Sequence, residues 1–315
     1  MVKSKNIPIV LAFTPNYLVP AATCLLSILE HAANMATFDV ICLLSETLTN
    51  DRMEQLRNLD RTRLTFTFLD LQDHFQHVDI HVDARYTIAA SYRLLLADLL
   101  PDYARVIYLD CDLIVRNDLA TLFQKITLTD YYMAGVFEAT LASQQAYMKE
   151  IGCQDGAYIN SGFLVMNLAL LRADKMGPKL LLAAQQKNLQ FPDQDVINQL
   201  CQGKILGLPP YYNAIRTFFL PQYKKDFLRY YSPQDWLAVA RHGTVHYTGS
   251  KPWNSLTVQF ALWWSYYEKL PKGIKTGFLK SRKYYLIFKI YNTPVFRQIV
   301  DLLLSLYRHA KYKLK

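Results

Sequence analysis

The chain has 315 residues, of which 51% are hydrophobic, and a formal net charge of +9 at pH 7. This length and apolar content allow a sizeable buried core and exclude an intrinsically disordered chain. No stretch reaches the roughly 18 uninterrupted apolar residues of a membrane-spanning helix, and residues 1–5 lack a signal-peptide profile, so we expect a cytoplasmic protein.

The positive charge is concentrated near the C-terminus. Residues 269–315 carry 12 Lys or Arg and one acid, Asp301, whereas residues 1–268 have a net charge of −2. This distribution argues against a nucleic-acid-binding protein. It predicts a near-neutral catalytic domain, residues 1–268, followed by a basic, aromatic-rich extension, residues 269–315. The five cysteines are scattered without C-x-x-C spacing, so we expect neither a disulfide framework nor a zinc site.

The first part of the chain alternates predicted strands and helices. Such alternation predicts an α/β fold with a mostly parallel central sheet. Between the third strand and the next helix, His74, His77 and His81 fit neither one helical face nor a zinc motif, and we interpret them as part of a loop. The pattern predicts strands at residues 7–13, 38–44, 63–69, 105–109 and 133–137 and after the turn at 160–162, and helices at 20–31, 49–59, 87–100 and from about 192.

Two carboxylates follow the fourth predicted strand: Asp110 and Asp112, separated by Cys111. In an extended chain residues i and i+2 point to the same side, roughly 7 Å apart, so both carboxylates can face one cation. Open α/β sheets bind ligands at the carboxyl ends of their strands, and buried like charges need a compensating cation. The pattern therefore predicts a metal site, with two acids in a solvated turn as the alternative.

Polar residues also stand at the starts of two later elements. Asn160 and Ser161 lie in a small-residue turn before a strand, where they could bind a polar ligand or serve ordinary turn chemistry. Asp193, Gln194 and Asp195 lie at the start of a predicted helix, where acids also act as caps.

A further cluster lies at residues 243–253, where a strand-end His246 precedes a glycine turn and Lys251. Histidine suits a manganese-class ion, and a glycine backbone with a lysine suits a phosphate. Together with the two carboxylates, this segment predicts a site for a metal ion and a diphosphate.

These segments together resemble the family-8 glycosyltransferases, retaining enzymes that include bacterial lipopolysaccharide galactosyltransferases and resemble glycogenin. The resemblance spans residues 7–254, and the joint occurrence of the motifs is far more specific than any one of them. It implies a single Rossmann-like nucleotide-sugar-binding domain of the GT-A type. It also implies Mn²⁺- or Mg²⁺-dependent transfer of galactose or glucose from a UDP-hexose. The matching segments are residues 12–17, Arg93, 108–112, 160–162, 193–195 and 246–253.

The resemblance implies roles for single residues. The metal ligands would be Asp110, Asp112 and His246. Gly249 and Lys251 would hold the diphosphate, and Cys111 lies inside the same nucleotide-binding motif. The uridine pocket would contain Ala12, Thr14, Asn16 and Tyr17, and the donor hexose would contact Arg93, Asn160, Ser161, Asp193 and Gln194, of which Arg93, Asp193 and Gln194 are the candidate catalytic residues.

The chain departs from the family pattern in places. Many members have an aspartate where Thr14 stands, and their spacing from His to Lys is commonly one residue longer than His246 to Lys251. Glu138 stands near the place where some relatives have an acid by the acceptor. Gln194 lies where a nucleophile would be expected, and an amide is a poor nucleophile. We therefore expect front-face attack on the donor rather than a covalent intermediate.

The sequence of the C-terminal extension, residues 269–315, predicts a contact with another surface. From Pro294 a helical pattern places apolar residues on one face and basic residues at its end. Such a helix is typical of attachment to an anionic membrane surface, and packing on the catalytic domain or a dimer contact is the alternative. We expect peripheral attachment at the inner face of the cell membrane, and a glycolipid, wall polymer or glycoprotein as acceptor.

Two other functions fit parts of the pattern. Haloacid-dehalogenase-type phosphatases also place D-x-D at a strand end, but normally on the first strand, and here three predicted strands precede it. A non-enzymatic basic surface-binding protein would explain the extension. It would not require polar clusters at the strand ends.

Overall fold

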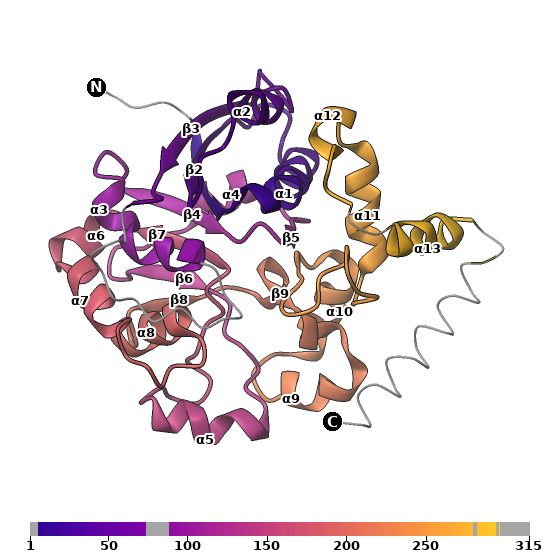
Figure 1. The fold of residues 1–315 in the computed structure, drawn as a ribbon. Coiled ribbons are helices and arrows are strands. Elements are labelled where there is room, and N and C mark those ends of the chain that lie inside the picture. Colours follow the sequence, from indigo (N-terminus) through magenta and orange to yellow (C-terminus); the bar gives the residue numbers. More distant parts are fainter. Residues whose placement is uncertain (1–5, 74–87, 280–281, 294–295, 297–315) are drawn as a thin grey trace.

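The computed structural model describes residues 6–73, 88–279, 282–293 and 296 (Figure 1). At its centre is a seven-stranded sheet in the order β3-β2-β1-β4-β7-β6-β8. The pairing is parallel from β3 through β4, antiparallel on both sides of β7, and parallel between β6 and β8. The strands are β1 (Ile7–Phe13), β2 (Phe38–Leu44), β3 (Leu64–Asp70), β4 (Arg105–Leu109), β6 (Met133–Gly135), β7 (Phe163–Asn167) and β8 (Ile205–Gly207).

A second, three-stranded sheet follows the carboxyl end of β4. It has the order β5 (Leu113–Ile114), β10 (Val245–His246) and β9 (Ala214–Ile215). Strand β10 is antiparallel to β5 and parallel to β9. This small sheet brings the region after residue 240 next to the segment that follows β4.

Helices cover both faces of the large sheet. Because side chains alternate along a strand, Ile9 and Leu11 of β1 belong to one core cluster with α1, whereas Val10 belongs to a second cluster with the 3₁₀ helix η2 (Ile88–Leu95). The α-helices are α1 (Leu18–His31), α2 (Asn50–Arg57), α3 (Leu96–Leu99), α4 (Leu119–Lys125), α5 (Ala142–Glu150), α6 (Leu168–Ala173), α7 (Met176–Ala183), α8 (Pro192–Leu200), α9 (Lys224–Phe227), α10 (Pro233–His242), α11 (Phe260–Lys269), α12 (Lys272–Lys275) and α13 (Lys283–Tyr291). Four further short 3₁₀ helices are η1 (Pro15–Tyr17), η3 (Pro210–Tyr212), η4 (Arg216–Phe219) and η5 (Pro221–Tyr223).

The predicted α/β fold with a mostly parallel sheet is confirmed. The predicted α-helix at 87–100 is wrong in its first part, because residues 88–95 form a 3₁₀ helix. With three residues per turn, Ala89, Tyr92 and Leu95 lie in one row, and all three are buried in the same core cluster. The strand predicted at 133–137 ends at Gly135. Residues 74–87, which include the three histidines of the predicted loop, lie outside the described residues.

The described part of the C-terminal extension packs on the rest of the molecule. Ile274 of α12 and Phe288 of α13 are each 1% exposed and belong to the core cluster that contains α1. Figure 1 shows α11 and α12 beside α1, with α13 against α11. The domain boundary at residue 268 stays a prediction, and the helix predicted from Pro294 lies outside the described residues except for residue 296.

Candidate active site

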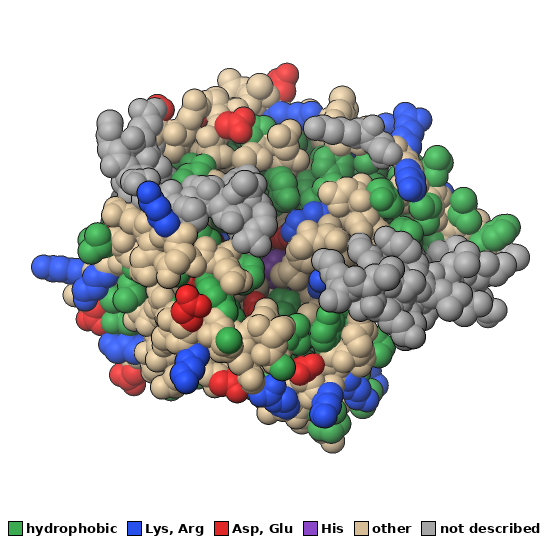
Figure 2. Space-filling model, turned by 60° about the horizontal axis from the view of Figure 1, so that its bottom comes forward, with side chains coloured by type: hydrophobic (Ala, Val, Ile, Leu, Met, Phe, Trp, Pro, Cys, Tyr) green, Lys and Arg blue, Asp and Glu red, His purple; other side chains and the backbone are tan. Residues whose placement is uncertain are grey.

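Two carboxylates and an imidazole meet where the two sheets adjoin. Asp110 and Asp112 flank the turn between β4 and β5, and His246 ends β10, whose pairing with β5 places His246 opposite Leu113. One ligand atom from each of Asp110, Asp112 and His246 lies within 4.8 Å of the others. Figure 2 shows histidine and acidic side chains in a hollow of this face. Two carboxylates and an imidazole suit a divalent cation of the manganese class.

A glycine makes room for this cluster. A Cβ atom on Gly162 would lie 2.3 Å from Cε1 of His246 and 2.7 Å from Oδ2 of Asp110. The backbone at Gly162 also accepts a hydrogen bond from the backbone N–H of Asp110 at 2.8 Å. The sequence predicted a turn here, and the structure shows that close approach of the backbone to the cluster requires the glycine.

Asn213, which the sequence analysis missed, orients the imidazole. Its Nδ2 donates to Oδ1 of Asn160 at 3.0 Å, so its own Oδ1 is the atom 3.0 Å from Nδ1 of His246. An amide oxygen accepts, so Nδ1 donates to it, and of the two neutral tautomers this contact selects the one with its lone pair on Nε2. Nε2 lies 3.4 Å from Asp112 and 3.7 Å from Asp110. The tautomer set by Asn213 is the one that a metal ligand needs.

Lys251 contacts the same cluster. Its Nζ donates to Oδ2 of Asp112 and, at 2.9 Å, to the backbone oxygen of Tyr247. Burial opposes ionisation of Asp112, but Lys251 and His246 outweigh it and hold the pKa of that carboxyl below its usual value. Gly249 has a φ of +76° in the turn before Lys251, and a Cβ there would meet open space. The lysine is thus beside the candidate metal ligands, where a phosphate could also reach it.

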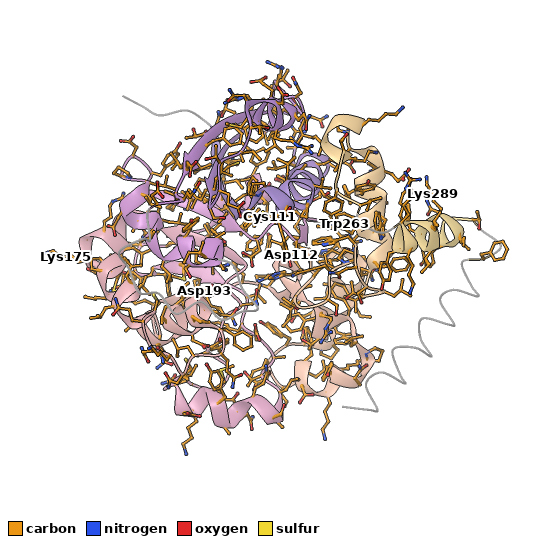
Figure 3. The ribbon with its side chains drawn as sticks, viewed as in Figure 1. Cys111, Asp112, Lys175, Asp193, Trp263 and Lys289 are labelled. Atoms are coloured by element: carbon orange, nitrogen blue, oxygen red, sulfur yellow. The ribbon has the colours of Figure 1, made fainter. Side chains whose placement is uncertain are left out.

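Arg93 ties the carboxylates to the polar turn. The guanidinium donates to the backbone oxygen and Oγ of Ser161 at 2.6 and 2.8 Å, and to Asp110 at 2.8 Å. Its Nε lies 3.1 Å from Asp193, and its carbon lies 4.5 Å from the ring centroid of Tyr108. Arg93 is 3% exposed, so these contacts compensate a buried charge. Figure 3 labels Asp112 and Asp193, which lie near the centre of the molecule.

A polar network extends from Asn160 to the start of α8. Nδ2 of Asn160 donates to Glu138 at 3.0 Å and to Oε1 of Gln194 at 3.1 Å. Oγ of Ser161 lies 3.2 Å from Asp193. Burial raises the pKa of Glu138 and of Asp193, while hydrogen bonds to Glu138 and the charge of Arg93 near Asp193 act in the opposite direction. The structure thus joins Asn160, Ser161, Asp193 and Gln194 in one network and adds Glu138 to it.

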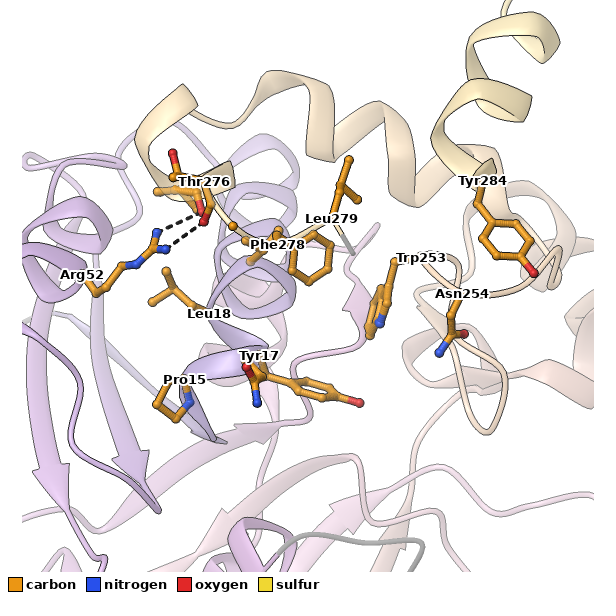
Figure 4. A pocket seen from close by; sticks show the side chains of 14 residues that line it. Pro15, Tyr17, Leu18, Arg52, Trp253, Asn254, Thr276, Phe278, Leu279 and Tyr284 are labelled. Atoms are coloured by element: carbon orange, nitrogen blue, oxygen red, sulfur yellow. Dashed lines mark hydrogen bonds between the residues drawn. The ribbon is translucent and has the colours of Figure 1, made fainter. Parts of the chain in front are cut away.

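The residues expected in the uridine pocket lie at the end of β1 and the start of η1. Asn16 and Tyr17 line a cavity of about 430 Å³ (Figure 4). Its other walls include Trp253, whose ring meets Tyr17 edge-on at 5.8 Å, and Phe278. Thr14 stands between β1 and η1, where its backbone oxygen accepts from Tyr17 at 2.8 Å.

Ala12 and Cys111 meet beneath this region. The thiol of Cys111 lies 3.8 Å from the backbone oxygen of Ala12 and belongs to the core cluster. Burial raises the pKa of the Cys111 thiol well above its usual value, so it stays protonated. Its side chain is therefore part of the core rather than of the candidate metal cluster, although its neighbours in sequence both belong to that cluster.

The sequence matches the family model described as glycosyl transferase family 8 over residues 8–257. A lipopolysaccharide 1,2-glucosyltransferase of Escherichia coli is 30% identical over 253 residues, which cover 76% of this chain and 70% of that protein. The haloacid-dehalogenase alternative is not supported by this match.

Solved structures show the same fold. Galactosyltransferase LgtC, in complex with donor and acceptor sugar analogs, aligns with a TM-score of 0.69 at 21% identity and covers 85% of this chain and 99% of its own. The apo structure of the bifunctional glycosyltransferase WbbM aligns with a TM-score of 0.72 at 20% identity, covering 87% of this chain and 52% of its own. The predicted GT-A type of fold is thereby confirmed. In the part of the chain that the structure describes, no helix is long and apolar enough to cross a membrane.

Proposed function

The chain belongs to glycosyltransferase family 8, and on this premise we propose that it transfers galactose or glucose from a UDP-sugar to a cell-envelope or other glycoconjugate acceptor, with retention of the anomeric configuration. The observation that carries the proposal is the cluster of Asp110, Asp112 and His246 at the carboxyl end of β4. Their ligand atoms are close enough for one cation, and Asn213 keeps Nε2 of His246 available for it.

In this proposal Asp110, Asp112 and His246 hold Mn²⁺ or Mg²⁺. When bound, the cation supplies Lewis-acid stabilisation of the charge on the departing diphosphate. Lys251 and the backbone at Gly249 would hold the diphosphate, which the closeness of Lys251 to Asp112 supports. Asn16 and Tyr17, which line the cavity, would contact the uridine, and Tyr17 is close enough to Lys251 and Asp112 for their charges to act on its hydroxyl.

The donor sugar would contact the network that joins Arg93 to Gln194. Arg93, Asn160, Ser161, Asp193 and Gln194 present guanidinium, amide, hydroxyl and carboxylate groups, which suit sugar hydroxyls. These side chains already bond to one another, so they are held in place before a sugar binds, which favours catalysis through preorganisation.

Front-face attack is the mechanism that we propose for retention. Gln194 offers only a weakly nucleophilic amide. Asp195 is fully buried, and its oxygens accept from Tyr158, Tyr147 and the backbone N–H of Phe191, so it is not placed to attack a sugar. Asp193 is held by Arg93 and Ser161. A stable adduct on Asp193 or Asp195 after incubation with a fluorinated UDP-sugar would contradict front-face attack.

The activity is tested by measuring UDP release from a panel of UDP-hexoses by the purified protein, with Mn²⁺ or with EDTA. We expect metal-dependent release from one hexose donor and a loss of at least 100-fold in Asp112→Ala, because the metal site would lose a ligand. Asp174→Ala is the matched control, since Asp174 is a partly exposed carboxylate paired with Lys204.

A different outcome would overturn the proposal. If neither hydrolysis nor calorimetric binding of UDP in the presence of Mn²⁺ were observed, the chain would not use a UDP-sugar. Binding of UDP without hydrolysis would instead point to a strict acceptor requirement, to be met by adding lipid-linked or wall-derived saccharides.

We also propose that the C-terminal extension attaches the enzyme to an anionic membrane surface at the inner face of the cell membrane. Within the described residues, Leu286 and Ile290 of α13 are 56% and 50% exposed, and they lie on the same helix as Lys283 and Lys289. Exposed apolar side chains with adjacent cations suit an interfacial helix. Flotation with phosphatidylglycerol vesicles should fall when residues 282–315 are deleted; unchanged flotation would contradict the attachment.

A further inference from the structure

The side-chain amide of Gln194 is held in one orientation by five hydrogen bonds, one of which runs from Oγ of Ser161 to Oε1 at 3.4 Å. Its Oε1 accepts from the backbone N–H of Ser161 at 3.0 Å and from Nδ2 of Asn160 at 3.1 Å. Its Nε2 donates to the hydroxyl oxygen of Tyr158 at 3.0 Å and to Oε1 of Glu138 at 3.3 Å. A 180° rotation would place two donors against each other at Ser161 and two acceptors together at Tyr158.

Tyr158 accepts from Gln194 because its own proton is used elsewhere. Its hydroxyl donates to Oδ1 of Asp195 at 2.5 Å, and both side chains are fully buried. Asp195 is fixed in turn, because its Oδ2 accepts from the backbone N–H of Phe191 at 2.8 Å and from the hydroxyl of Tyr147. With its proton committed to Asp195, the hydroxyl of Tyr158 has only a lone pair to offer to Gln194.

Glu138 does not fix the amide in the same way. A carboxylate accepts only, but a protonated carboxyl group can also donate. Burial raises the pKa of Glu138, so its proton is more readily retained there than in water. Burial raises the pKa of Tyr158 well above its usual value, which keeps the phenol in its donating form. Of the two partners of Nε2 of Gln194, only Tyr158 is therefore an acceptor regardless of whether Glu138 is protonated.

We propose that Tyr158, held by Asp195, is a positioning residue for the transfer reaction that fixes the orientation of the Gln194 amide. The inference rests on the proposed function, in which Gln194 faces the donor sugar. Positive charge develops at the anomeric carbon as the glycosidic bond breaks. An amide dipole in a fixed orientation then acts on that charge without reorganising, whereas a rotating amide does not.

The test compares Tyr158→Phe with Tyr147→Phe. Both substitutions remove one phenol donor to Asp195, but only Tyr158 contacts Gln194. With the UDP-hexose that the panel identifies, we expect Tyr158→Phe to lower kcat at least tenfold while KM for the donor stays within about twofold. Tyr147→Phe should leave kcat within about threefold. Thermal unfolding of both variants checks that they fold.

A double-mutant cycle separates positioning from general damage. If Tyr158 acts through Gln194, Tyr158→Phe should cause no further loss of kcat in a Gln194→Ala background. Equal losses in Tyr158→Phe and Tyr147→Phe, or losses that multiply in the double mutant, would overturn the proposal.

A spectroscopic readout does not depend on activity. In protein labelled with ¹⁵N at glutamine side chains, the signal that is missing in Gln194→Ala identifies this amide. We expect its protons to exchange with solvent at least tenfold faster in Tyr158→Phe and at the wild-type rate in Tyr147→Phe. Unchanged exchange in Tyr158→Phe would overturn the inference even if the enzyme used a different donor, and failure of the UDP-sugar panel alone would overturn only the proposed function.

Discussion

Nδ1 of His246 lies 3.0 Å from Oδ1 of Asn213, a fully buried amide 33 residues earlier in the chain. This hydrogen bond links β10 to the residue just before β9. In this bond Asn213 is the acceptor, because its Nδ2 already donates to Asn160 and only its Oδ1 faces His246. A single buried amide therefore decides which ring nitrogen of His246 faces Asp110 and Asp112.

Asn213→Leu should weaken metal binding. The leucine is close in size but accepts no hydrogen bond, so His246 loses the partner that fixes its tautomer and ring orientation. Loss of such a partner typically costs about 10- to 100-fold in metal affinity. Calorimetric titration of the protein with Mn²⁺ and UDP measures it. Asn117→Ala is the control, because Asn117 donates to the carbonyls of Tyr211 in η3 and of His242 at the end of α10 without touching the cluster. Equal losses in both variants would contradict the assignment.

Gly162→Ala should disrupt the candidate metal cluster. The new Cβ would lie 2.3 Å from Cε1 of His246, so the backbone or the imidazole must move. Overpacking of this kind costs about 1–3 kcal/mol of stability, and we expect Mn²⁺ binding to fall at least tenfold. Gly273→Ala provides the comparison, because its Cβ would meet only Gln55 at an ordinary 3.5 Å. Normal metal binding by Gly162→Ala would show that the cluster tolerates the displacement.

Glu138 should make stability depend on pH. Burial raises its folded-state pKa above the ordinary value of 4.5, so the folded protein binds the proton more tightly than the unfolded chain. Its contribution to stability is present below pH 4.5 and is lost as the pH rises through the folded-state pKa. Urea unfolding between pH 4 and 7 should show a smaller loss in Glu138→Gln than in the wild type. Identical pH profiles would mean that Glu138 ionises as freely in the folded protein as in the unfolded one.

Arg52 should hold α12 in place. Its guanidinium donates to the backbone oxygens of Gly273, Ile274 and Thr276, at 3.2, 3.3 and 2.8 Å. Arg52→Ala leaves these carbonyls without that donor, and we expect about 1–3 kcal/mol of destabilisation and faster proteolysis of residues 270–279. Arg57→Ala on the same helix should have neither effect, because Arg57 is paired only with the exposed Glu54 among the ion pairs that the structure describes. Equal proteolysis of both variants would contradict this role.

The first four strands were predictable because buried parallel strands are continuous apolar runs or simple alternations. For β1, β2 and β3 the neighbours in sequence are also neighbours in the sheet, whereas β4 pairs with β1. The pair Asp110 and Asp112 was predictable for the same local reason. Asn213 was not, because it follows two tyrosines in a segment without a motif, and only the pairing of β9 with β10 brings it to His246. The 3₁₀ geometry of η2 was also missed, since an apolar spacing of three residues fits an α-helix nearly as well.

The buried network around Gln194 also could be predicted only in part from the sequence. The sequence placed Asn160, Ser161, Asp193 and Gln194 in one site through a family resemblance. It gave no sign that Tyr158 and Asp195 would orient the amide, because buried tyrosines and helix-capping acids are common in any core.

The pairing of β10 with β5 has a consequence for how the protein is made. His246 joins Asp110 and Asp112 only through a strand that pairs with residues about 130 positions earlier. A ribosome translating this chain therefore delivers both carboxylates long before the imidazole, and Asn213 also precedes His246. Until residue 246 has left the exit tunnel, the unfinished polypeptide lacks a complete cluster. Prematurely terminated chains that stop before β10 cannot assemble it at all.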